Sequence, residues 1–141
     1  MGQQQLLLVI LVTIIVGIAT VVAINTFGAA ADTANIDAVR QDLVAMAAAA
    51  QGYYAKPVMM GGGGRTFDGI TMHNLAFAGI IIENDLGVNE NGTYQISNTD
   101  DIAVTITAYA ASEDGYNSTN GPESFTAVIT MNDVNILRSG S

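Results

Sequence analysis

Residues 6–24 of the chain read LLLVILVTIIVGIATVVAI, and the rest of the sequence is best interpreted outward from this run. The run holds no charged residue, and the first charge in the chain is Asp32. An α-helix of about 19 residues rises about 28 Å, close to the hydrocarbon thickness of a bilayer. The run therefore predicts a helix that can lie in a membrane, with Thr13 and Thr20 bonding back to helix carbonyls.

The helical pattern continues beyond this apolar run. Residues 25–54 are rich in alanine, and no proline occurs before Pro57. Larger apolar residues recur three and four positions apart, which places them on one side of a helix. This stripe consists of Ile36, Val39, Leu43, Met46, Ala50 and Tyr53. Asp37 and Arg40 lie off the stripe and are expected to form a weak surface pair. We predict one helix over about residues 2–54, apolar in its first half and amphipathic in its second.

The flanks of the apolar run differ from those of a secretory signal peptide. Residues 1–5 read MGQQQ and lack the cationic residues that precede the apolar core of a signal peptide. No clean cleavage site follows the run directly, although the alanines at 29–31 are a candidate. Neither flank carries Lys or Arg, so the acidic residues that follow are what favours an outward-facing C-terminal part.

A loop and several short elements are predicted after the helix. Pro57 and the four glycines of residues 61–64 predict a helix end and a flexible surface loop. Residues 67–70 predict a turn that buries Phe67 and Ile70. Thr71 is a good N-cap for a short helix over residues 72–82, although residues 80–82 fit a buried strand equally well.

The remaining sequence predicts an antiparallel sheet. Apolar and polar residues alternate over residues 93–97, 102–109, 124–131 and 134–137. The apolar face would consist of Tyr94, Ile96, Ile102, Val104, Ile106, Ala108, Phe125, Ala127, Ile129 and Met131. The opposite face is rich in threonine, which is typical of a sheet with one face in water. The stripe of the helix is the expected cover for the dry face.

These elements predict an α+β fold, a long N-terminal helix packed against a small antiparallel sheet head. We divide it into an apolar half-helix (residues 1–31), an amphipathic half-helix (32–56) and the sheet head (57–141).

Composition and motifs argue against several kinds of function. A net charge of −9 with four basic residues argues against a nucleic-acid partner. The absence of cysteine excludes a disulfide, a thiolate zinc site and a cysteine nucleophile. His73 is the only histidine, and no acidic cluster has EF-hand spacing. We therefore expect no enzyme activity, no cofactor and no bound metal. The sequons at Asn91 and Asn117 are glycosylation candidates.

In architecture the whole chain resembles the type IV pilin superfamily, which includes the pseudopilins of secretion systems and archaeal pilins. The resemblance is concentrated in residues 1–24. Gly2 looks like the glycine before a prepilin-peptidase cut, and residues 6–24 look like the apolar half of the pilin helix. The two tyrosines at 53–54 with Pro57 look like the helix exit, and residues 67–70 like the aromatic–glycine turn before the sheet.

The chain departs from the family pattern in four respects. Glutamines occupy positions 3–5, where the family usually carries a glutamate. The paired cysteines, the proline within the helix and the basic leader residues of many pilins are absent. Either processing follows Gly2, or Met1 is already the mature start and the processing site lies upstream.

The resemblance implies a structural subunit of a type IV pilus-like filament at the cell surface. Such a subunit waits in the cytoplasmic membrane with its head outside, after processing by prepilin peptidase. The pilus assembly machinery then extracts it into a helical homo-oligomer. The alternatives are a pseudopilin and a single-pass anchored surface domain. Adhesion, motility and DNA uptake stay open as roles for the filament.

The resemblance also implies roles for particular residues. The membrane segment and later filament core would be Leu6, Leu7, Leu8, Ile10, Leu11, Ile14, Ile15, Val16, Ile18, Val21, Val22 and Ile24. Met1 of one subunit would pair with Gln5 of a neighbour, whose amide can accept the same hydrogen bond as the family's glutamate but without its charge.

Overall fold

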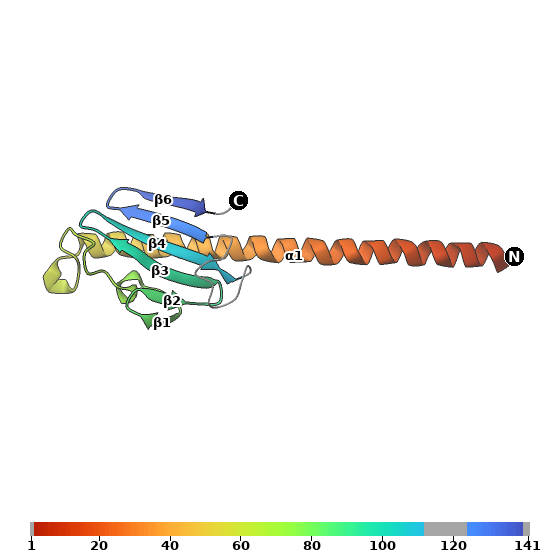
Figure 1. The fold of residues 1–141 in the computed structure, drawn as a ribbon, viewed down its shortest axis with the longest axis horizontal. Helices are drawn as coiled ribbons and strands as arrows, with labels where there is room; N and C mark the ends of the chain where they lie inside the picture. The colour runs from red at the N-terminus through yellow and green to blue at the C-terminus, as the bar shows by residue number, and fades with distance from the viewer. Residues whose placement is uncertain (1, 112–123, 140–141) are drawn as a thin grey trace. The chain divides into compact units, whose positions relative to one another are not determined.

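The computed structural model describes residues 2–111 and 124–139 of the chain (Figure 1). Over these residues a single α-helix, α1 (Gly2–Ala55), is followed by two 3-10 helices, η1 (Val58–Met60) and η2 (Met72–Leu75). The strands of the described part are β1 (Ile80–Glu83), β2 (Leu86–Val88), β3 (Gly92–Thr99), β4 (Ala103–Ala110), β5 (Ser124–Thr130) and β6 (Val134–Ser139). The fold is α+β, as predicted, and α1 ends within one residue of the expected position.

The chain divides into two compact units, Met1–Ala34 and Asn35–Ser141. The first unit is the apolar part of α1, where backbone groups beyond the first turn bond within the helix, as an apolar environment requires. Thr13 Oγ1 donates to the carbonyl oxygen of Val9 at 2.7 Å, and Thr20 Oγ1 donates to that of Val16 at 2.8 Å. These bonds confirm the predicted accommodation of both threonines within the apolar helix.

The second unit has its core between the C-terminal part of α1 and one face of the sheet. The buried side chains of α1 are Val39, Leu43, Met46, Ala47 and Ala50. All but Ala47 belong to the predicted stripe, and Ala47 lies four residues after Leu43 on the same side of the helix. Ile36 and Tyr53, the ends of the stripe, are partly buried against the same core.

The predicted surface pair on α1 is confirmed. Arg40 Nη1 lies 3.7 Å from Asp37 Oδ1, and both side chains are exposed. The Arg40 guanidinium also lies over the ring of Phe125, 5.3 Å from its centroid. Because the pair is exposed, we assign it little stability.

The sheet has the order β1-β2-β3-β4-β5-β6, and all neighbouring strands are antiparallel. The inward side chains of β3, β4 and β5 are buried as predicted, and they are Tyr94, Ile96, Val104, Ile106, Ala108, Phe125, Ala127 and Ile129. Two residues assigned to this face, Ile102 and Met131, are instead 74% and 57% exposed. Both lie just outside the strands, in the bends before β4 and after β5.

The predicted helix over residues 72–82 is wrong beyond its first turn. Thr71 and Asn74 form a capping box, but η2 ends at Leu75 and Ala76 adopts the left-handed conformation (φ 50°). The alternative for residues 80–82 is correct in type, because β1 is a strand, although Ile80 and Ile82 are exposed at the sheet edge. β2 was not predicted, since its three residues are too few to show an alternating pattern.

The glycines at 61–64 lie in a loop, as predicted, and Gly61 and Gly64 are exposed, but hydrogen bonds hold this loop against the end of α1. Gly62 and Gly63 are buried against the end of α1. The backbone nitrogens of Gly63, Gly64 and Arg65 donate to the carbonyl oxygens of Tyr53, Lys56 and Tyr54 at 2.8, 3.0 and 2.9 Å. The loop therefore supplies partners for carbonyls that every helix leaves unsatisfied at its C-terminus. Glycine is needed at two positions, because a Cβ at 62 would clash with Lys56 and a Cβ at 63 would clash with the carbonyl of Thr66 and the ring of Tyr53.

Substituting alanine for Gly63 is expected to destabilise the head by about 3 kcal/mol. A Cβ at this position would clash with the carbonyl oxygen of Thr66 and lie 2.7 Å from Cε1 of Tyr53, so the capping loop has to move. Denaturant unfolding of the full chain in detergent micelles measures the change. The control is Gly52→Ala, where a Cβ meets nothing within 4 Å and helix propensity predicts a gain of up to about 1 kcal/mol. Equal stability of the Gly63→Ala variant and the wild type would contradict the capping role.

Candidate functional site

The first candidate feature is the uncovered apolar part of α1. The side chains assigned to the membrane and filament core, Leu6 through Ile24, are each 54–67% exposed, which is the exposure of a helix with no neighbour. The most apolar stretch of 18 residues has a mean hydropathy of 3.2, and none of it is buried by the described residues. The helix is long and apolar enough to cross a membrane. A helix that is apolar on every side requires lipid or other helices around it.

Of the two residues proposed to pair at the N-terminus, the structure describes only Gln5. Gln5 lies on the exposed first turns of α1. Met1 lies outside the described residues, and its pairing with Gln5 of another copy stays a prediction.

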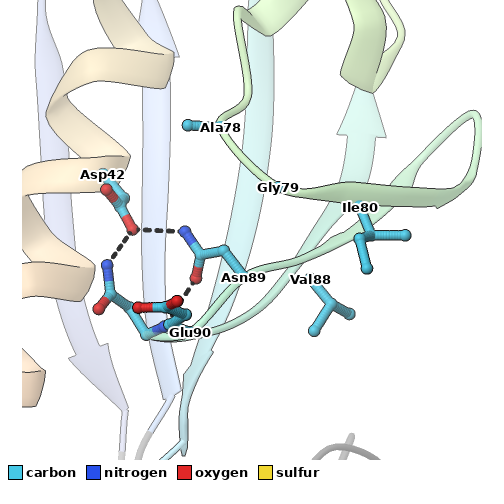
Figure 2. Close-up of a pocket in the computed structure, with 8 residues that line it drawn as sticks. Asp42, Ala78, Gly79, Ile80, Val88, Asn89 and Glu90 are labelled. Carbon is cyan, nitrogen blue, oxygen red and sulfur yellow. Dashed lines mark hydrogen bonds between the residues drawn. The ribbon is translucent and has the colours of Figure 1, made fainter.

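The second candidate feature is a carboxylate on the inner side of α1. Asp42 Oδ2 accepts three hydrogen bonds, from Asn89 Nδ2 at 2.8 Å, Asn91 Nδ2 at 2.8 Å and Tyr94 Oη at 2.7 Å. Figure 2 shows the bond from Asn89, and the two asparagine bonds join the helix to the turn between β2 and β3. Asn89 Oδ1 in turn accepts from the backbone nitrogens of Asn91 and Gly92. Hydrogen bonds to the Asp42 carboxylate therefore link α1 to the sheet.

This environment shifts two pKa values. Burial raises the pKa of the Asp42 carboxyl, but the hydrogen bonds from Asn91, Tyr94 and Asn89 together outweigh burial, and the net pKa lies below its ordinary value. Burial, the hydrogen bond to Asp42 and the charge of Asp42 all raise the pKa of the Tyr94 hydroxyl. Asp42 is therefore a stable anion and Tyr94 a stable donor at neutral pH.

Sequence reasoning missed Asp42, although the sequence contained a usable signal. Asp42 lies three residues after Val39 and four before Met46, so the helical period places it beside the buried stripe. A charged residue in that position needs partners, because an isolated buried charge is costly. The partners lie about 50 residues later, in the turn between β2 and β3 and on β3 itself, and nothing local in the sequence identifies them.

An open pocket adjoins this carboxylate. Its volume is about 610 Å³, and its lining consists of Asp42, Ala78, Gly79, Ile80, Val88, Asn89, Glu90 and Asn91. Figure 2 shows Ile80 and Val88 on β1 and β2 to one side, with Asp42 on α1 opposite. The pocket therefore combines an apolar wall with two carboxylates, and it can accept an apolar group that carries positive charge nearby.

The other residues considered from the sequence are dispersed. Asn91, a glycosylation candidate, uses its side-chain nitrogen to bond Asp42, and Asn117 lies outside the described residues. His73 is exposed on η2, where it lines a smaller pocket together with Lys56. Among residues 2–111 and 124–139, no three His, Asp or Glu side chains are grouped so that they could hold a metal ion.

The described residues thus include a long N-terminal helix with an apolar first half and an antiparallel sheet, which are the elements that the resemblance to pilins implies. Comparisons with protein-family models, with curated proteins and with solved structures found no match to this chain.

Proposed function

We propose that this chain is a structural subunit of an extracellular filament of the type IV pilin kind, held together by the N-terminal helices of many copies. The observation that carries the proposal is the apolar segment 6–24, which the described residues leave exposed and which belongs to the same α-helix as the buried stripe of the head. A filament uses both parts of such a helix, because the first part packs against other copies and the second part supports the head.

The free-energy cost of exposing this segment to water indicates that it needs lipid or other helices around it. Leaving a Leu, Ile or Val side chain in water instead of burying it costs about 1.5–3 kcal/mol. Summed over the apolar residues of the segment, this cost exceeds the typical stability of a whole domain, about 5–15 kcal/mol. The segment therefore needs lipid before assembly and sister helices afterwards. Exchanging one apolar environment for the other is nearly neutral, and close helix packing supplies the gain.

The length of the helix favours a filament subunit over a simple anchor. Before the head begins at Asn35, α1 rises about 50 Å, whereas the hydrocarbon core of a bilayer is about 30 Å thick. The excess lies in residues 25–34, which are uncharged up to Asp32 and include a run of small residues at 28–31. Small side chains let helices approach closely, so this stretch suits helix packing. An anchor needs no such extension.

The direct test is electron microscopy of material sheared from cells that produce this chain naturally. We expect thin fibres in which mass spectrometry identifies this chain. N-terminal mass spectrometry of the fibre then distinguishes a subunit that begins at Met1 from one cut after Gly2. The proposal would be refuted if the cells carried no fibres and the purified chain stayed monomeric in detergent under all conditions. That result would favour an anchored surface domain.

A further inference from the structure

The short helix η1 presents an exposed apolar surface at the end of α1. Val58, Met59 and Met60 are 71%, 99% and 67% exposed, and we call these three residues the apolar knob. Its backbone is well held, because Met60, Gly61 and Gly62 donate to the carbonyl oxygens of Pro57 and Val58 at 3.0–3.1 Å. Several adjacent apolar side chains held in water on a fixed turn indicate a contact surface.

The knob carries positive charge at its base. Lys56 precedes it by two residues and is exposed. Arg65 is also exposed, in the capping loop whose Gly64 lies against Val58. The two residues are half of the four basic side chains in a chain of net charge −9. The knob is therefore both apolar and locally cationic.

The pocket beside Asp42 has the complementary character, and we call it the acidic pocket. Ile80, Val88 and Ala78 give it an apolar wall, and Ile80 is 72% exposed. Asp42 and Glu90 give it negative charge, and the three hydrogen bonds on Oδ2 fix the Asp42 carboxylate in position. A pocket of about 610 Å³ can accept the side chains of a short turn.

The knob and the acidic pocket of one copy are too far apart to meet. Asp42 and Ala55 lie on the same helix, about 20 Å apart along its axis, and the knob follows Ala55. Both features belong to the unit Asn35–Ser141. The knob can therefore enter an acidic pocket only on another molecule. Two different surfaces that join copies form a heterologous contact, and such a contact builds an open helical array when the rotation between copies does not close into a ring.

We propose that the apolar knob of one copy docks in the acidic pocket of the next, with Lys56 and Arg65 lying against Asp42 and Glu90. A second copy is the favoured occupant because this one chain carries both complementary surfaces, the exposed apolar knob with its bases and the apolar pocket with its acids. This contact rests on the proposed filament, in which it would join neighbouring heads.

Cysteine cross-linking in the full chain tests the contact, since the chain has no cysteine of its own. The double variant Met59→Cys/Ile80→Cys is oxidised in membranes and in sheared fibres and then resolved by denaturing electrophoresis. We expect a ladder of covalent multimers, because the cysteine at 59 of each copy would form a disulfide with the cysteine at 80 of the next copy. The single variants should give no ladder. The matched control is Leu137→Cys/Ile80→Cys, since Leu137 is 55% exposed but lies on β6. If this control gave a ladder and the Met59→Cys/Ile80→Cys variant gave none, the proposed contact would be wrong, and the copies would instead meet through the edge strands β1 and β6.

Charge reversal tests the electrostatic part of the contact in the same cross-linking background. Lys56→Glu and Glu90→Lys should each lower the yield of multimers about fivefold, and the double reversal should restore it. Absence of rescue would overturn the assigned pairing of charges. Fibres without the Met59–Ile80 ladder would refute the contact and leave the filament intact. A ladder in membranes of cells that never form fibres would support the contact and refute the filament.

Discussion

Val16→Asp is expected to abolish fibres. Val16 lies in the middle of the apolar segment, and its side chain is 56% exposed in the isolated chain. In a filament the same side chain would be enclosed by neighbouring helices, where an unpaired carboxylate costs several kcal/mol. Each copy would carry this cost, so assembly should fail. Insertion into the membrane should suffer less, because insertion scales assign a central aspartate only about 2.5–3.5 kcal/mol.

Two measurements separate assembly from insertion, namely fibre yield after shearing and the amount of chain in the membrane fraction. The expected result is a chain that still reaches the membrane but forms no fibres. The matched control is Leu137→Asp, because Leu137 has nearly the same exposure, 55%, but lies on β6 of the head. This variant should form fibres at close to the normal yield. Abundant fibres of normal form from the Val16→Asp variant would remove the helix-packed filament from consideration.

The features that could be predicted from sequence are those set by local periodicity. The spacing of Val39, Leu43 and Met46 places them on one side of a helix whatever lies opposite. Alternation over residues 102–109 likewise identifies β4 and its inward side chains, Val104 and Ile106 among them. Both patterns repeat several times within one element, so each is determined without knowledge of the rest of the fold.

The features that were missed depend on contacts between distant segments. The local sequence of the glycines at 61–64 predicts a flexible loop. In the structure the carbonyl oxygens of Tyr53 and Tyr54 accept hydrogen bonds from the loop backbone and hold it in place. The short β1–β2 hairpin joins the sheet through β2, which pairs with β3, and it extends the sheet beyond its alternating strands. The hydrogen-bond donors to Asp42 come from a segment far along the chain. Single-sequence patterns carry little information about such long-range pairings.

Asp42→Ala is the second substitution for which we expect a large effect, a loss of about 3 kcal/mol in the free energy of unfolding of the head. Its removal takes the acceptor from three donors at once. Tyr94 is the costliest of them, because its side chain is fully buried and its hydroxyl donates to Asp42 at 2.7 Å. Denaturant unfolding of the full chain in detergent micelles measures the loss.

The control for this loss is another aspartate of the same helix. Asp37 lies in the exposed pair with Arg40, at 3.7 Å, so Asp37→Ala should change stability by less than about 0.5 kcal/mol. Tyr94→Phe completes a double-mutant cycle with Asp42→Ala, and the two losses should be clearly less than additive. Additive losses would mean that the hydroxyl and the carboxylate contribute independently, against the network described above.

The same carboxylate predicts how stability depends on pH. The pKa of Asp42 is lower in the folded protein than in the unfolded chain, so the unfolded state binds the proton more readily. The stabilisation from Asp42 is therefore complete above about pH 5 and is lost as the pH falls through about 4 towards the folded pKa. Asp42→Asn has no such titration. The stability difference between the wild type and this variant should be largest at neutral pH and shrink at acidic pH. A difference that stays constant from neutral pH to about pH 3 would show that the charge of Asp42, as distinct from its shape, contributes nothing to holding α1 against the sheet.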